Sequence, residues 1–270
     1  MLVGRMSVEL AQLQAVVEEV GAALLRWRAE VLGTGTWSGG QMKAEVDARA
    51  HELTSELLAG VDPNLPVVSE ESLDSQSHER PARYFLIDPI DGTASYVNGF
   101  DGFVTQVALM EGARPVLSAI CAPALGETFC AALGGGATLN GAPLVPSGPR
   151  DELRLIDNYP EARGFAVLAS EALGCTGYVE SGSISLKICR LADRSAELFV
   201  KDVAVRDWDL AAPDLVLREA GGALTRLDGS TVPYAGSYQH VGLIATYDPS
   251  QIASIAKALS RAAAESAAGA

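Results

Sequence analysis

The sequence predicts a mixed α/β protein, and three features of its 270 residues support this fold class. The first part has apolar residues at helical spacing, the middle has short apolar runs between turn residues, and the last part alternates strand-like with helix-like segments. Hydrophobic residues make up 48% of the chain and charged residues 20%, which is enough for a sizeable core. We therefore expect a folded domain, and neither a disordered chain nor a coiled coil.

Two amphipathic helices are predicted at the start of the chain. The first covers residues 7–31, where apolar residues recur on one face, and it is expected to end near Gly33 and Gly35. The second covers residues 45–58. Its apolar face consists of Val46, Ala50, Leu53 and Leu57.

Short strands are predicted to follow these helices. The apolar segments at 66–68 and 84–87 each run directly into acidic residues, and the polar stretch 73–83 between them is predicted to be a loop. Residues 102–144 favour strands joined by turns, with hairpin signals at Glu111-Gly112 and Asn140-Gly141.

Three consecutive glycines, Gly134–Gly136, raise the question of a phosphate-binding loop. No Gly-Lys-Ser/Thr sequence follows them, so a flexible connecting loop is the preferred interpretation.

A stretch rich in Pro, Gly and Ser, Val145–Glu152, predicts a boundary between two halves, 1–148 and 149–270. The second half is predicted to be α/β, because strand-like and helix-like segments alternate in it. The predicted strands are 165–170 and 196–200, and the predicted helices are 185–195 and 209–222.

The net charge of −14 argues against a nucleic-acid polymer or a membrane surface as a partner, because both are anionic. No 18-residue apolar run is present, and Glu9, Glu18 and Glu19 interrupt any leader-like segment, so a cytoplasmic location is expected. The four cysteines form no Cys-x-x-Cys pair and are expected to be buried thiols.

The segment FLIDPIDGTAS carries the strongest chemical signal. An apolar strand delivers Asp88 at its end, and Asp91 follows three residues later, so both carboxylates can converge on one ion. Gly92 allows a phosphate oxygen to approach the backbone, and Thr93 adds a hydroxyl next to an anion-binding turn. Oxygen-only ligands favour magnesium over zinc. A plain turn is the alternative, because Pro-x-Asp-Gly is also a turn sequence.

Further acidic residues have ordinary explanations when each is considered alone. Glu70 and Glu71 follow a strand and repel each other unless they are solvated or bridged by a cation. Asp209 begins a predicted helix, where an N-cap explains it. Asp47 lies on the second predicted helix among ordinary polar residues. Their combination with the Asp88–Thr93 motif is harder to explain without a metal site.

The segments VVSEES, FLIDPIDGTAS and WDLAAPDLVLREAGG, in this order, resemble the inositol monophosphatase superfamily over roughly residues 47–234. These are magnesium-dependent, lithium-sensitive phosphatases that include inositol monophosphatases and 3'(2'),5'-bisphosphate nucleotidases. The resemblance implies a layered αβαβα sandwich of the inositol monophosphatase and fructose-1,6-bisphosphatase type.

The resemblance also implies roles for individual residues. Two or three Mg²⁺ ions would be held by Glu70, Asp88, Asp91 and Asp209 with the carbonyl of Ile90. Gly92 and Thr93 would hold phosphate, with Asp91 and Asp209 at the same subsite. Asp47 and Thr93 would orient and help deprotonate an attacking water, with Glu70 part of the catalytic group. The ions would offset the charge of an anionic substrate, which explains how an acidic protein can bind a small phosphate ester.

Two alternatives compete with a phosphatase of this superfamily. A haloacid-dehalogenase-type phosphatase has the motif Asp-x-Asp-Gly-Thr near its N-terminus, whereas here the spacing is Asp-x-x-Asp-Gly-Thr and starts at Asp88. A catalytically silent phosphate- or metal-binding paralogue is the non-enzyme alternative, although every motif carboxylate is present.

The substrate is predicted from two further segments. VVSEE and SISLKIC, which includes Ser183 and Lys187, resemble the bisphosphate nucleotidases, so 3'-phosphoadenosine 5'-phosphate is the preferred substrate, giving AMP and phosphate. Ser183 departs from the glycine usual there, and Lys187 could also be a helix-surface lysine. Asp202 lies seven residues before Asp209, where the inositol branch of the family carries an acidic residue that contacts sugar hydroxyls, and this resemblance implies an inositol or sugar phosphate instead. Members of this family are often homodimers, which leaves the oligomeric state open.

Overall fold

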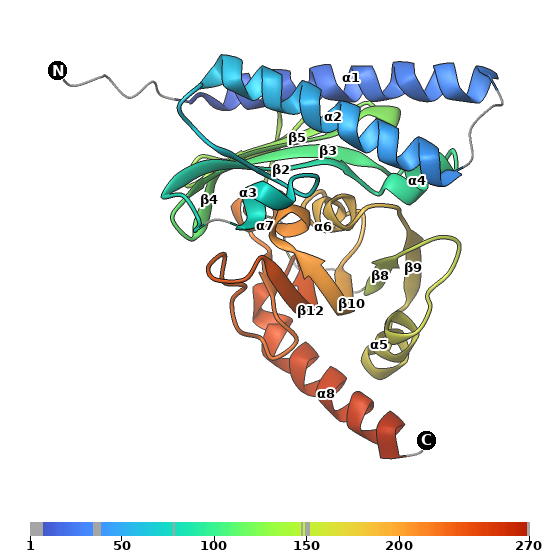
Figure 1. Cartoon of the computed structure of the whole chain (residues 1–270). Coiled ribbons are helices and arrows are strands. Elements are labelled where there is room, and N and C mark those ends of the chain that lie inside the picture. The colour runs from blue at the N-terminus through green and yellow to red at the C-terminus, as the bar shows by residue number, and fades with distance from the viewer. Residues whose placement is uncertain (1–7, 35–38, 78, 147, 149–151, 269–270) are drawn as a thin grey trace.

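The computed structural model describes residues 8–34, 39–77, 79–146, 148 and 152–268, without the side chains of 31–44. Two long helices, α1 (Leu10–Thr34) and α2 (Gly39–Val61), cover one face of a seven-stranded sheet. Helices α6 (Ile184–Ala192) and α7 (Asp207–Glu219) lie between this sheet and a five-stranded one, which α5 (Phe165–Leu173) and α8 (Ile252–Ala268) cover from below (Figure 1). This is the predicted αβαβα sandwich.

The first sheet follows chain order from β1 to β7, and every pair is antiparallel except β1 with β2. The hairpins predicted at Glu111-Gly112 and Asn140-Gly141 are both present. The strands are β1 (Val67–Ser69), β2 (Arg83–Asp91), β3 (Val104–Glu111), β4 (Arg114–Ala122), β5 (Glu127–Ala132), β6 (Gly136–Leu139) and β7 (Ala142–Leu144).

The second sheet has the order β11-β12-β10-β8-β9, with β8 parallel to both of its neighbours. Strand β10 carries a register shift between Lys201 and Ala204. The strands are β8 (Arg154–Asp157), β9 (Gly177–Glu180), β10 (Leu198–Arg206), β11 (Ala223–Thr225) and β12 (Gln239–Thr246).

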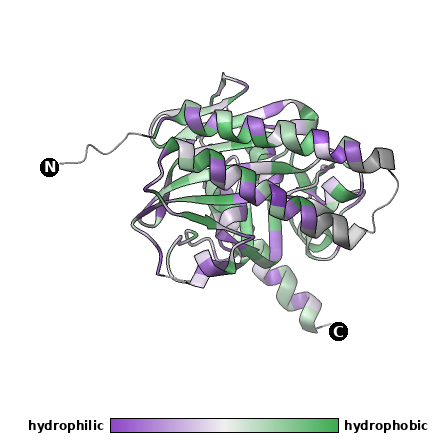
Figure 2. Ribbon diagram, turned by 45° about the horizontal axis from the view of Figure 1, so that its top comes forward, coloured by the Kyte–Doolittle hydropathy of each residue, from purple (hydrophilic) through white to green (hydrophobic). Residues whose placement is uncertain are grey.

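Three apolar clusters fill the spaces between the layers, and Figure 2 shows the apolar residues concentrated on the strands. The central cluster joins the first sheet, α6, α7 and the second sheet. The backbones of the two halves also meet directly, because the N–H of Ser183 donates to the carbonyl of Gly102 at 2.7 Å. A Cβ on Gly182 would lie 1.9 Å from that carbonyl oxygen. The halves therefore share one core; the boundary predicted at 148/149 adjoins residues 149–151, which lie outside the described part.

Two predicted elements are wrong in type. Residues 165–170, predicted to be a strand, belong to helix α5, because a short apolar run fits a buried strand and a buried helix equally well. The predicted loop 73–83 contains the short helix α3 (Leu73–Ser77) and the start of β2. The end of the first helix predicted at Gly35 falls outside the described residues.

The triple glycine is anchored to α7. The N–H groups of Gly134 and Gly136 donate to the two carboxylate oxygens of Glu219, each at 2.9 Å. The loop between β5 and β6 therefore binds a carboxylate of the protein itself, that of Glu219. The glycines form a connecting loop, as predicted, and Glu219 holds the backbone of that loop.

The cysteines are free thiols, as predicted, with three of them buried and Cys175 half-buried. Within the described part of the chain, no helix combines the length and the apolar character needed to cross a membrane.

Candidate metal centre

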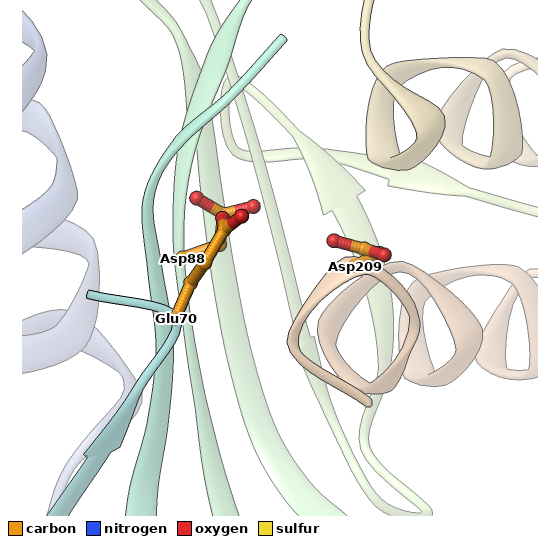
Figure 3. A group of neighbouring side chains, drawn as sticks. All are labelled: Glu70, Asp88 and Asp209. Atoms are coloured by element: carbon orange, nitrogen blue, oxygen red, sulfur yellow. The ribbon is translucent and has the colours of Figure 1, made fainter. Parts of the chain in front are cut away.

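Three carboxylates converge between the two sheets. Glu70 follows β1, Asp88 lies on β2, and Asp209 is in the first turn of α7. One oxygen from each lies within 4.8 Å of the others. Figure 3 shows Glu70 and Asp88 side by side, with Asp209 facing them from its helix. These three were all predicted as metal ligands, and the fold brings them together.

The parallel pairing of β1 with β2 explains why Glu70 and Asp88 meet. Ser69 lies opposite Ile87, so the next residue of each strand emerges at the same end of the pair. The side-chain amide of Gln76, on α3, donates to the carbonyls of Ser69 and Glu70 at 2.8 and 2.9 Å. The Glu70 segment is therefore fixed by its backbone, while its side chain reaches solvent.

The Asp-Pro-Ile-Asp motif is an irregularity in β2, where the register with β3 shifts between Asp88 and Asp91. At this irregularity, the N–H of Ile90 donates to the carboxylate of Asp88 at 2.9 Å. The carbonyl of Ile90, predicted as a metal ligand, accepts the hydroxyl of Thr93 at 3.1 Å.

The electrostatics of this site are unfavourable without a cation. Burial raises the pKa of Asp88 well above its usual value, and the negative charges of Glu70, Asp91 and Asp209 raise it further. Burial and the charge of Asp91 likewise raise the pKa of Asp209. A group of oxygen ligands with this much mutual repulsion is what a hard divalent ion such as Mg²⁺ would neutralise. The residues present therefore fit such an ion.

Asp91 has a partner that the sequence did not indicate. Its carboxylate accepts the N–H of Ser185 at 2.7 Å and that of Ile184 at 3.4 Å, so it lies at the N-terminus of α6. Gly92 follows with a φ of 86°, in the left-handed region, and a Cβ there would lie 3.1 Å from the Gly102 carbonyl oxygen. Only glycine suits both the turn and this close approach.

The predicted water-orienting pair lies beside this turn. Asp47 is buried on α2, and α2 contacts α4 (Thr93–Val97), the short helix that begins with Thr93. The roles assigned to Asp47 and Thr93 stay predictions.

The predicted substrate residues lie in different places. Lys187 is buried on α6, so it is not a helix-surface lysine; its ammonium donates to the Asn158 side chain at 2.5 Å and to the Gly182 carbonyl at 2.9 Å. Burial lowers its pKa to about 8. Ser183 caps α6 by accepting the N–H of Leu186 at 2.9 Å. Asp202 is exposed and lines a cavity between α5 and α8 whose walls include none of the three carboxylates.

Sequence reasoning missed the residues that brace α7 at this site. The buried Gln106 donates to the carbonyl of Trp208 at 2.8 Å and to the hydroxyl of Ser185 at 2.6 Å. That hydroxyl in turn donates to the carbonyl of Asp209 at 3.0 Å. The sequence feature that could have indicated this role is a glutamine within a mostly apolar strand, since a buried amide needs hydrogen-bond partners.

Comparison with known proteins decides the family. The model of the inositol monophosphatase family matches residues 9–264. The chain belongs to the inositol monophosphatase family. This is a family of phosphatases that act on small phosphate esters.

Proteins with different assigned roles are similar to the chain. The 3'(2'),5'-bisphosphate nucleotidase CysQ of Salmonella typhimurium is 30% identical over 199 residues, covering 70% of this chain and 77% of that protein. The Nus factor SuhB of Pasteurella multocida is 27% identical over 210 residues, covering 75% and 78%. The histidinol-phosphatase of Mycobacterium tuberculosis is 34% identical over 165 residues, covering 57% and 63%.

Solved structures of family members share the fold. Inositol monophosphatase-II from Staphylococcus aureus superposes with a TM-score of 0.76 at 18% sequence identity, covering 89% of this chain and 92% of that one. At this identity the likeness supports the sandwich architecture alone.

Proposed function

We propose that the chain is a magnesium-dependent phosphomonoesterase that transfers the phosphoryl group of a small ester to water. The observation that carries this proposal is the convergence of Glu70, Asp88 and Asp209, with one oxygen from each within 4.8 Å. These three residues, with Asp91 and the carbonyl of Ile90, would hold two or three Mg²⁺ ions. When bound, such ions lower the pKa of water and offset charge on the phosphoryl oxygens.

The chain's own residues would hold and orient the reactants. The N–H groups of Gly92 and Thr93 and the hydroxyl of Thr93 would bind phosphate oxygens, because they are donors at the start of α4 directly after Asp91. Asp47 and Thr93 would orient a water and help deprotonate it, the proton passing to a carboxylate, with Glu70 part of the catalytic group. The water oxygen forms a bond to phosphorus, the ester P–O bond breaks, and the leaving oxygen takes up a proton.

Release of inorganic phosphate tests this proposal. Wild-type protein with Mg²⁺ should hydrolyse at least one small phosphomonoester, and lithium should inhibit it. Treatment with a chelator should abolish turnover, and added Mg²⁺ should restore it. Full activity in metal-free protein would contradict the assigned chemistry, and absence of activity towards every ester would favour the catalytically silent alternative.

We propose 3'-phosphoadenosine 5'-phosphate as the preferred substrate. The CysQ relative supports this choice, as does the Ser-Leu-Lys run that ends at Lys187. A second phosphate needs a cationic partner, and Lys187 and Lys201 both lie near Asp157, with ammonium–carboxylate distances of 3.6 and 4.0 Å.

Lys187→Ala tests the nucleotide proposal. Loss of a charge-assisted contact should raise KM for the bisphosphate roughly 10- to 150-fold, from a contribution of about 1.5–3 kcal/mol. Hydrolysis of inositol 1-phosphate should change little, and Lys257→Ala on α8 serves as a control. Because Lys187 also bonds Asn158 and Gly182, equal losses on both substrates would assign it a structural role.

An inositol or sugar phosphate is the second candidate, because the chain belongs to the inositol monophosphatase family. Asp202 lines the cavity between α5 and α8, apart from the three carboxylates, and does not support it. A panel of 3'-phosphoadenosine 5'-phosphate, inositol 1-phosphate and histidinol phosphate separates the candidates by kcat/KM. Much faster hydrolysis of inositol 1-phosphate would reverse the ranking.

A further inference from the structure

A buried charge cluster lies beside the metal centre, on the same turn of α7. Asp207 is the first residue of this helix and is fully buried. One of its carboxylate oxygens lies 2.5 Å from the guanidinium of Arg80, and the other lies 2.5 Å from Nε2 of His240. Its N–H donates to the carbonyl of Tyr238 at 2.9 Å. Asp207 is therefore held from three sides.

Arg80 uses every edge of its guanidinium. Its Nε donates to the carbonyl of Gly236 and its Nη2 to that of Ser237, both at 3.1 Å, while its Nη1 donates to the hydroxyl of Tyr84 at 3.1 Å. The guanidinium also stacks on the ring of Tyr238 at 3.8 Å. These contacts hold the planar guanidinium in a single orientation. A lysine at this position could not make the same set of hydrogen bonds.

The cluster connects the two sides of the metal centre. Arg80 follows α3, whose Gln76 holds the Glu70 backbone, and it pairs with Asp207 on the helix that carries Asp209. The helix turn is rigid at this point, because the carboxylate of Asp209 accepts the N–H of Arg206 at 2.7 Å. Fixing Asp207 therefore fixes Asp209 relative to Glu70.

We propose that Arg80, together with Asp207 and His240, is a positioning residue that sets the distance between Asp209 and the other two carboxylates, and with it the affinity for Mg²⁺. When no cation is bound, Glu70, Asp88 and Asp209 place carboxylate oxygens within 4.8 Å of one another, so movement of the N-terminus of α7 away from the other two would relieve their repulsion. The ion pair of Arg80 with Asp207 opposes that movement. This inference rests on the proposed metal-dependent function.

Binding of Mg²⁺ alone, measured by calorimetry without substrate, tests the proposal. Arg80→Gln should weaken Mg²⁺ binding at least about tenfold, as loss of a residue that orients a metal ligand does. Arg83→Gln is the matched control, since Arg83 lies on the same segment but pairs with Glu111 at 3.1 Å and should stay within about twofold of wild type. Arg80→Lys should fall between wild type and Arg80→Gln.

Activity as a function of Mg²⁺ gives a second readout. In Arg80→Gln the Mg²⁺ concentration for half-maximal turnover should rise, while kcat at saturating Mg²⁺ should largely recover; a general folding defect would lower kcat at every concentration. Wild-type affinity in Arg80→Gln would overturn the proposal. If that variant does not fold, wild-type affinity in Arg80→Lys or His240→Gln would overturn it instead.

Two further outcomes keep this test separate from that of the proposed function. Failure of all three variants to fold would assign the cluster to stability alone and also overturn the positioning role. If the wild type binds Mg²⁺ but hydrolyses no ester, the proposed function fails while the calorimetric comparison still decides the role of Arg80. If the wild type does not bind Mg²⁺, both proposals fail.

Discussion

Asp207 and Asp209 lie two residues apart in the first turn of α7, yet they occupy opposite electrostatic environments. Asp207 is buried between Arg80 and His240, so its charge is compensated within the protein. Asp209 faces Glu70 and Asp88, and burial and neighbouring negative charge raise its pKa well above the usual range. The same residue type is therefore paired with a cation at one position and belongs to a cluster of carboxylates at the other.

The difference shows that the partners of a buried acid, and not its burial, indicate its role. Asp214, further along α7, supports this view. It is fully buried, but it accepts the hydroxyl of Tyr234 at 2.8 Å and pairs with Arg218 at 2.8 Å, and burial raises its pKa only to about 6. Asp214 is therefore compensated by neighbouring side chains, whereas Asp88 and Asp209 have other carboxylates as their nearest charged neighbours.

The largest expected effect is on turnover. Asp209→Asn or Asp88→Asn should reduce kcat by at least about a hundredfold, since each removes charge that holds the metal ions stabilising the transition state. The metal-free variants should be as stable as the wild type or more so, because like-charge repulsion is relieved. Phosphate release at saturating Mg²⁺, with thermal unfolding, measures both.

Asp91→Asn sharpens this test. It should also lose turnover, but it should lose stability as well, because Asn keeps only one of the two oxygens that accept the N–H groups of Ile184 and Ser185, and it removes a negative charge from the N-terminus of α6. Near-wild-type turnover in any of these three variants would contradict the assigned ligand set.

For Asp207→Asn we expect a loss of stability, in contrast to Asp209→Asn. Removing one partner of a buried ion pair leaves Arg80 uncompensated, which costs about 3–5 kcal/mol of unfolding free energy. The lower end of this range is expected, because Arg80 keeps its bonds to the carbonyls of Gly236 and Ser237. Urea denaturation at saturating Mg²⁺ measures the change; an unfolding free energy equal to that of Asp209→Asn would remove the distinction between the two aspartates.

The third prediction concerns the pH dependence of stability in metal-free protein. The pKa values of Asp88 and Asp209 are raised in the folded state. Their stabilising contribution to the unfolding free energy is therefore fully present below the ordinary carboxyl pKa of about 4, and it is lost as pH rises through the raised values. The loss is about 1.4 kcal/mol for each unit of raised pKa. Mg²⁺ should remove this decline.

Asp214 provides the internal control for that measurement. Its raised pKa of about 6 gives a decline of the same sign that ends near pH 6 and does not depend on Mg²⁺. Asp214→Asn should therefore remove the part of the decline that persists with Mg²⁺. An unfolding free energy that rises with pH above 4 in metal-free protein would contradict the charge repulsion inferred for the site.

The smallest effect is expected at the exposed pair of Arg83 with Glu111. Glu111 keeps 47% of its side chain exposed, so solvent screens the interaction and Arg83→Gln should cost less than about 1 kcal/mol. Urea denaturation of Arg83→Gln and Asp207→Asn compares the losses of unfolding free energy in the two variants. Equal losses would mean that burial does not distinguish the two ion pairs.

Local sequence patterns predicted much of the fold. The helical spacing in α1 and α2, the hairpin signals at Glu111-Gly112 and Asn140-Gly141, and the helices α6 and α7 were all recognised from the residues. The prediction failed at α5, where the apolar run is too short for its period to separate strand from helix. The αβαβα layering came from the resemblance to a family, because residue periodicity carries no information about which layers stack.

For the site, the sequence by itself determined which carboxylates are available and which strand or helix end delivers each: Glu70 after β1, Asp88 on β2 and Asp209 at the start of α7. Only the tertiary structure decided which acids are compensated. Arg80 and His240 reach Asp207 from distant parts of the chain, and Lys187 is buried against Asn158. Sequence spacing sets local direction, whereas the free energy of a buried charge depends on neighbours that only the folded chain brings within a few ångströms.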